Sequence, residues 1–122
     1  METVQTRRQV RESLKTLGQL RQAEEMRHRA ALMRDAAKKL DGDSREATLK
    51  MAKTLSQSGG RIIREAGKIS GKLSVLSPME QKIIMLRYVD RKSWQRVCEE
   101  VHYSREYTAR IERQAVDKLR KA

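Results

Sequence analysis

The side chains with the clearest chemical potential are arginines near the C-terminus. Arg105, Arg110 and Arg113 follow Ser104 in a segment whose pattern predicts a helix with a basic exposed face. A guanidinium group carries a rigid fork of donors that suits phosphate oxygens and base edges. On an ordinary surface helix such side chains are simply solvated, whereas on the second helix of a helix-turn-helix they contact DNA. The elements that position them therefore decide between these two interpretations.

A helix is predicted to begin just after residue 76. Ser77-Pro78-Met79-Glu80 combines a serine cap, a proline at the first helical position and a glutamate that closes a capping box. This helix is expected to extend to Val89. A polar turn follows from Asp90 to Ser93, and Ser93 is the next cap.

The last two predicted helices form a helix-turn-helix pattern. A short helix carries Trp94, Val97, Cys98 and Val101 on one face, His102-Tyr103 breaks it, and Ser104 caps a longer helix. Cys98 is expected where the two helices touch, because a small residue is needed there. Trp94 is expected in the core, Tyr103 in the turn, and Tyr107 toward a DNA groove or a phosphate. The inward residues of the last helix are expected to be Ile111, Ala115, Val116 and Leu119.

The N-terminal part is predicted to be helical as well. Residues 4–40 are interpreted as one long helix that ends at Asp41-Gly42, with a shift of register near Gly18. A second helix is expected from Asp43 to Ser58-Gly59-Gly60, and a third over about 61–76. The apolar seams of the first and third helices suit an antiparallel hairpin or an intermolecular bundle. Packing along the rest of the chain, dimerisation and a frayed basic arm remain alternatives for the first helix.

The composition indicates a polyanionic partner. The 122 residues include 28 Lys and Arg against 16 Asp and Glu, which gives a formal net charge of +12. Such a charge favours nucleic acid, although acidic proteins and anionic lipid also attract basic proteins. No apolar run approaches the length of a membrane span, and no apolar core follows the first arginines as in a secretory signal. We therefore expect an intracellular protein with no membrane partner.

Catalytic and metal-binding chemistry finds little support. The sequence has no glycine-rich phosphate loop, no nucleophile with a plausible histidine and no metal-ligand spacing. Cys98 is the single cysteine and is expected to be a packing residue rather than a redox sensor. His28 and His102 are scattered and are expected to be structural or surface residues. We therefore expect no enzyme activity, no cofactor and no metal.

The motifs of the C-terminal segment, taken together, resemble a known family. Residues 76–121 contain a Leu-Ser-Pro-x-Glu start, a Leu-Arg-Tyr that ends the first helix, a Ser-Arg-Glu that opens the last helix and a closing Ala-x-x-Lys-Leu-Arg. This combination resembles region four of bacterial sigma factors of the sigma-70 family. Lys92-Ser93-Trp94 and Tyr103-Ser104 look like the corresponding residues of small phage-encoded regulators of this type.

The resemblance implies recognition of the minus-35 promoter element in the major groove and docking on the flap of the RNA polymerase β subunit. By position, Arg105 and Glu106 open the recognition helix, where Arg can read guanine and Glu can accept from cytosine. Arg110 falls where the family often has Gln, and Arg113 lies one turn further on. Ser104 matches the capping residue, which can also reach a phosphate.

Three positions depart from the family pattern. Ala109 stands where sigma factors usually have a DNA-contacting Arg, Thr108 replaces a buried aliphatic residue, and His102 replaces a turn glycine. These departures leave the target sequence and the polymerase contact open, and no sigma region two is recognisable. The candidate DNA-binding residues are Lys92, Arg96, Ser104, Arg105, Glu106, Tyr107, Ala109, Arg110 and Arg113. Lys118, Arg120 and Lys121 are further candidates for phosphate contacts.

The sequence thus predicts an all-α protein in two parts. Residues 1–76 form a helical segment that offers a dimerisation or partner surface, and residues 77–122 form a sigma region 4-like helix-turn-helix domain. The expected function is sequence-specific binding of double-stranded DNA through a recognition helix at about 104–119. The protein would regulate transcription for a phage or prophage, in the cytoplasm of a bacterial cell or an infected host. The alternatives are a module that binds RNA polymerase or a sigma factor, with weak DNA binding, and a small-terminase-like recogniser in DNA packaging.

Overall fold

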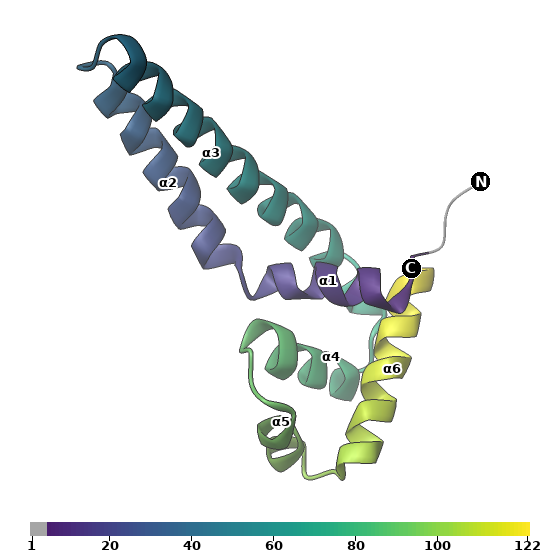
Figure 1. The fold of residues 1–122 in the computed structure, drawn as a ribbon. Coiled ribbons are helices and arrows are strands. Elements are labelled where there is room, and N and C mark those ends of the chain that lie inside the picture. The colour runs from purple at the N-terminus through teal and green to yellow at the C-terminus, as the bar shows by residue number, and fades with distance from the viewer. Residues whose placement is uncertain (1–4) are drawn as a thin grey trace. The chain divides into compact units, whose positions relative to one another are not determined.

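The computed structural model describes residues 5–122, which form helices joined by short turns and contain no strand (Figure 1). The prediction of an all-α fold is confirmed. The α-helices are α1 (Arg7–Leu17), α2 (Leu20–Ala37), α3 (Gly42–Ser70), α4 (Pro78–Ile84), α5 (Trp94–Val101) and α6 (Arg105–Lys121). A 3-10 turn, η1 (Leu73–Val75), precedes α4, and a π-helical turn, η2 (Met85–Val89), follows it. Within the described residues, no helix combines the length and the apolar character that a membrane crossing requires.

The chain divides into two compact units. Unit 1 contains the residues up to Gly18 and those from Ala66 to Ala122, and unit 2 contains Gln19–Glu65. Unit 2 is therefore inserted in sequence between two segments of unit 1. Helix α3 begins in unit 2, and its last turn belongs to unit 1.

Two apolar clusters hold unit 1 together. The first cluster joins α1 to α6 and includes the fully enclosed side chains Leu14, Ile84 and Leu119. Burial of each such side chain contributes about 1.5–3 kcal/mol. The second cluster joins α4, α5 and α6 through Ile83, Leu86, Val97, Val101 and Ile111. The predicted inward residues of α6, which are Ile111, Ala115, Val116 and Leu119, are all buried.

Serine caps start α4, α5 and α6 where the sequence predicts. Ser77 accepts a hydrogen bond from the Glu80 backbone N–H, and the Glu80 side chain accepts one from the Ser77 backbone N–H, which completes the capping box with Pro78 in the first turn. Ser93 caps α5 and Ser104 caps α6. These predictions hold because a capping motif is local and works in any tertiary context. The last turn of the predicted 78–89 helix is π-helical, with Asp90 N–H donating to the Met85 carbonyl at 2.9 Å.

The prediction of one helix over residues 4–40 is wrong. Residues 1–4 lie outside the described part, and the helix is interrupted at Gly18 and Gln19, between α1 and α2. A β-carbon on Gly18 would lie 2.4 Å from the Tyr88 carbonyl oxygen, so glycine allows the end of α1 to sit directly against that backbone. The register shift that the sequence shows near Gly18 therefore marks the end of a helix and not a bend within one.

The prediction that Ser58-Gly59-Gly60 ends a helix is also wrong. Helix α3 continues from Gly42 to Ser70 and begins one residue before the expected cap, Asp43. A β-carbon on Gly59 would lie 2.7 Å from the Ala23 carbonyl oxygen of α2, so this glycine permits close approach of two helices. Glycine has a lower helix propensity than alanine, by about 1 kcal/mol per residue. The close packing of α2 against α3 outweighs this loss.

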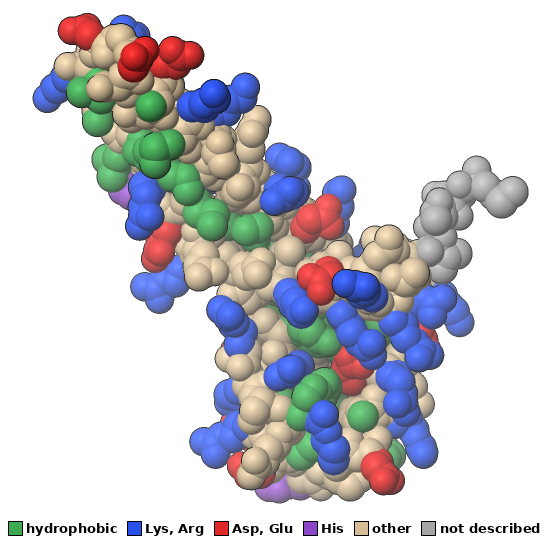
Figure 2. Space-filling model, in the orientation of Figure 1, with side chains coloured by type: hydrophobic (Ala, Val, Ile, Leu, Met, Phe, Trp, Pro, Cys, Tyr) green, Lys and Arg blue, Asp and Glu red, His purple; other side chains and the backbone are tan. Residues whose placement is uncertain are grey.

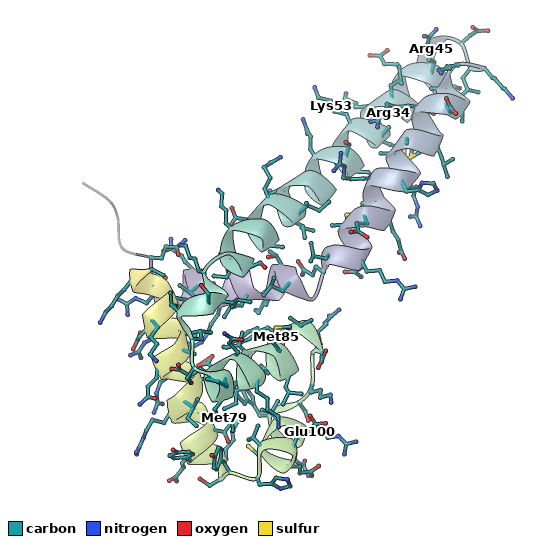
Figure 3. All side chains as sticks on the ribbon, turned by 180° about the vertical axis from the view of Figure 1, so that it is seen from behind. Arg34, Arg45, Lys53, Met79, Met85 and Glu100 are labelled. Carbon is teal, nitrogen blue, oxygen red and sulfur yellow. The ribbon has the colours of Figure 1, made fainter. Side chains whose placement is uncertain are left out.

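Unit 2 is an antiparallel hairpin of α2 and α3 (Figure 1). Ala23, Ala30 and Ala37 recur every seven residues on α2 and are all buried. Small side chains at this spacing keep one face of α2 close to α3. Basic side chains such as Arg34, Arg45 and Lys53 are exposed along the hairpin (Figure 3).

Candidate nucleic-acid interface

A left-handed residue and a cap set the start of α6. His102 ends α5 with φ 60° and ψ 36°, which a non-glycine residue adopts rarely. Ser104 then accepts a hydrogen bond from the Tyr107 backbone N–H at 3.1 Å. The expected tight turn between the two helices is present. It leaves the first residues of α6 at the surface.

Helix α6 has two distinct faces. The buried face consists of Thr108, Ile111, Glu112, Ala115, Val116 and Leu119. The predicted DNA-contacting residues Arg105, Glu106, Tyr107, Arg110 and Arg113 are all exposed, and Ala109 is half-buried. The structure therefore brings these predicted site residues together along one stripe of α6. Figure 2 shows many Lys and Arg side chains on the visible face of unit 1.

Trp94 is not a plain core residue, contrary to the expectation. It is half-buried and packs against the second apolar cluster. The Arg105 guanidinium lies 4.7 Å from the centroid of its ring, and that of Arg87 lies 5.0 Å from it. Such cation–π contacts are worth about 0.5–1 kcal/mol at exposed sites. Trp94 therefore helps to position the first arginine of α6.

The two tyrosines around the turn contact each other. The rings of Tyr103 and Tyr107 meet edge to face, with centroids 4.8 Å apart. Tyr103 is 39% exposed and Tyr107 45%, so Tyr103 is less enclosed in the turn than expected. Cys98 is also only half-buried, and Val97 is the enclosed residue at this position of α5.

A buried carboxylate that the sequence analysis missed ties α1 to α6. Both Glu112 oxygens accept hydrogen bonds from Arg11, at 2.7 and 3.0 Å, and the Tyr88 hydroxyl donates to one of them at 2.9 Å. The Glu112 side chain is 4% exposed and that of Arg11 is 35% exposed. Burial, reinforced by the Glu112 charge, raises the pKa of Tyr88 well above its ordinary value. The hydrogen bond to Glu112 likewise raises the pKa of Arg11.

A second ion pair joins the same two helices. Arg7 donates two hydrogen bonds of 2.9 Å to the Asp117 carboxylate. These bonds, with a smaller contribution from Arg120, lower the pKa of Asp117 to about 2. No local pattern in the sequence announces either pair, because the partners are 101 and 110 residues apart. The one feature of the sequence that could have indicated such a pair is an acidic residue, Glu112, on the inward face of α6.

Several predicted phosphate-binding residues have acidic partners. Lys92 donates to Glu100 at 2.6 Å, and the pair of Arg96 with Glu99 spans 3.4 Å. The Lys118 ammonium binds buried Glu80 at 2.7 Å. Burial alone would raise the pKa of Glu80, but the hydrogen bonds from Lys118 and from Ser77 outweigh it, and the pKa lies below its ordinary value. Arg120 contacts Asp117 and the Gln5 carbonyl.

A short helix, a left-handed turn residue and a capped second helix with a basic exposed stripe define a helix-turn-helix domain. Residues 73–121 match the family model described as sigma-70, region 4. This part of the chain is therefore a sigma-70 region 4-like domain, and the family is one of DNA-binding helix-turn-helix domains. The match excludes α1 and the hairpin. No curated protein and no solved structure matched the chain.

Proposed function

We propose that this protein is a sequence-specific, double-stranded DNA-binding regulator of transcription. The observation that carries the proposal is the exposed stripe at the start of α6, within the part that matches the DNA-binding family. Arg105, Arg110 and Arg113 form no ion pair with any residue in 5–122, so their donors are available to a ligand. An origin in a phage or prophage is part of the same proposal and rests on the sequence resemblance.

Each residue of the stripe has a proposed role when α6 enters the major groove. Arg105 and Arg110 donate to guanine edges, and Glu106 accepts from cytosine. Ala109 presents a methyl group, which suits the thymine methyl better than a phosphate. Arg113 reaches a base or a phosphate one turn further along the helix.

The remaining candidates act at the DNA backbone. Ser104 and Tyr107 approach a phosphate at the start of α6, and Lys92 and Arg96 neutralise phosphates near α5. To bind a phosphate, Lys92 must break its ion pair with Glu100 and Arg96 its ion pair with Glu99. Their contribution to affinity should therefore be smaller than that of an unpaired cation.

The test is selection of bound fragments from random and bacterial genomic DNA at low and moderate salt. The expected result is a motif that persists as salt rises, because base contacts do not depend on counterion release. In the double variant Arg105→Ala/Arg110→Ala the motif should be lost, while each lost bidentate pair weakens discrimination by about 1–3 kcal/mol. Lys53→Ala, on the hairpin, is the matched control. An unchanged motif in the double variant would refute the proposed readout.

A second candidate is a module that binds RNA polymerase or a sigma factor. It is favoured by apolar side chains exposed on the hairpin, notably Leu32 at 57% and Met51 at 60%. Met33, Met51 and Leu55 line a groove of about 720 Å³ between α2 and α3. Binding to purified polymerase that is lost in Met51→Glu, together with DNA binding that selects no motif, would favour this function over the first.

The same apolar surface suits a homodimer through the N-terminal helices. Sedimentation equilibrium distinguishes the possibilities. A dimer that dissociates in Met51→Glu supports the homodimer, whereas ring-sized oligomers would favour the small-terminase-like alternative. A monomer at micromolar concentration would exclude both assemblies.

A further inference from the structure

A basic groove lies between α1 and the exposed stripe of α6. Its volume is about 450 Å³. Helix α1 contributes Arg8, Arg11, Glu12 and Lys15, which have the spacing of one helical face. The opposite side is formed by Arg105, Ala109 and Arg113 of α6. Trp94 and Arg87 also line the groove.

The groove carries an excess of positive charge that the protein leaves unbalanced. Two acidic side chains line it, Glu12 and Glu112. The Glu112 carboxylate accepts hydrogen bonds from Arg11 and Tyr88. Glu12 forms an ion pair of 3.0 Å with Lys15, and both of these side chains are exposed. Such an exposed pair is weak, worth about 0–1 kcal/mol.

The groove's remaining cations are free for a ligand. Across residues 5–122, the guanidinium groups of Arg8, Arg105 and Arg113 have no carboxylate partner. The charges of Arg8 and Arg113 are therefore available to an anion that enters the groove, whereas Arg105 is assigned to a base edge in the proposed function.

The position of the groove follows one flank of the recognition helix. A helix with its side chains is about 10–12 Å across, and the major groove of DNA is about 12 Å wide. The sugar-phosphate strands therefore run along both flanks of an inserted helix. Arg105, Ala109 and Arg113 are spaced four residues apart along one flank of α6, and this flank faces α1 across the groove.

We propose that this groove holds the phosphate backbone of the bound DNA, and that Arg8 and Lys15 of α1 contact it. The proposal rests on the proposed function, since α6 must enter the major groove. It adds to the DNA interface a helix that lies outside the segment matched to sigma-70 region 4. The Arg11–Glu112 and Arg7–Asp117 pairs hold α1 against α6, so its cations are positioned before DNA arrives.

The test measures the affinity of the full chain for a duplex with the selected motif, and for an unrelated duplex, over a range of salt concentrations. The variants are Arg8→Gln, Lys15→Gln and their combination. Each lost phosphate contact should reduce the slope of log affinity against log salt by about 0.9. The double variant should lose between about 10- and 100-fold in affinity at 0.1 M salt, equally on both duplexes.

Two further variants make the test specific to the groove. Glu12→Gln removes a negative charge from it and should strengthen binding to both duplexes. Lys82→Gln removes an exposed cation of α4 that does not line the groove, and should leave the salt slope unchanged. In ethylation interference, modification of phosphates on one side of the site should weaken binding of the wild type. The same modifications should not weaken binding of the double variant.

The possible failures are distinguishable. If the wild type selects a motif but Arg8→Gln/Lys15→Gln keeps its affinity and salt slope, the groove proposal is overturned and the proposed function stands. If no motif is selected while these variants still lower the salt slope on any duplex, sequence-specific regulation fails and the phosphate contact stands. Absence of any DNA binding overturns both.

Discussion

The buried carboxylate of Glu112 gives the sharpest prediction for stability. Arg11→Met keeps the aliphatic stem of the arginine but removes both of its hydrogen bonds to Glu112. Among the described residues the carboxylate then keeps one donor, the Tyr88 hydroxyl, in a site where its side chain is 4% exposed. The free energy of unfolding should therefore fall, because a buried charge is left without its counter-charge.

The size of the loss follows from the burial of the two partners. Removing one partner of a fully buried pair costs about 3–5 kcal/mol. Arg11 is 35% exposed, so water can reach part of the space that it leaves, and we expect about 2–3 kcal/mol. Glu112→Gln should cost only about 1 kcal/mol, since Tyr88 can still donate to the amide oxygen and Arg11 can turn to solvent. Arg11→Met combined with Glu112→Gln should therefore lose less than the sum of the single losses.

The assay is urea unfolding followed by the fluorescence of Trp94, the single tryptophan, which lies in unit 1. Circular dichroism reports both units together, so agreement of the two signals also tests whether they unfold together. A loss below about 0.5 kcal/mol in Arg11→Met, or strict additivity in the double variant, would show that Arg11 does not stabilise the Glu112 charge.

Three other predictions follow from single contacts. The pKa of Asp117 is lowered from 3.8 to about 2 by Arg7, so its contribution to stability is complete above about pH 4, is lost as pH falls toward 2, and should be absent from the acid unfolding curve of Asp117→Asn. Gly18→Ala places a β-carbon 2.4 Å from the Tyr88 carbonyl oxygen and should lower the melting temperature by several degrees, and an unchanged value would refute this close approach. Within residues 5–122 the buried Thr108 hydroxyl has no hydrogen-bond partner, so Thr108→Val should raise the free energy of unfolding by about 1 kcal/mol, and a loss of that size would show that the hydroxyl is in fact paired.

The parts of the fold that depend on local motifs were predictable. Ser77, Ser93 and Ser104 mark helix starts in the sequence, and each caps a helix in the structure. The exposed stripe of α6 followed from helical periodicity once Ser104 fixed the start. His102 was placed in the turn because it stands where the family has a turn glycine, and it adopts the left-handed conformation that glycine favours.

The parts that depend on distant partners were not predictable. Gly59 reads as a helix stop in the sequence, yet it serves close packing against Ala23, which only the hairpin reveals. Glu112 is an ordinary helical residue until Arg11 is brought to it from 101 positions away. Trp94 was expected in the core because it shares a helix face with Val97 and Val101, and its contact with Arg105 depends on how α5 packs against α6.

The insertion of the hairpin between the two segments of unit 1 has a consequence for the order of folding. Helix α1 is synthesised before the hairpin, whereas its partners on α6 are synthesised after it. Helices α2 and α3 are complete before then, and their contacts are between segments close in sequence, which form quickly. The finished hairpin holds Ala23, near the start of α2, against Gly59 of α3. It thereby shortens the loop that must close, and lowers the entropy that α1 and α6 lose on meeting.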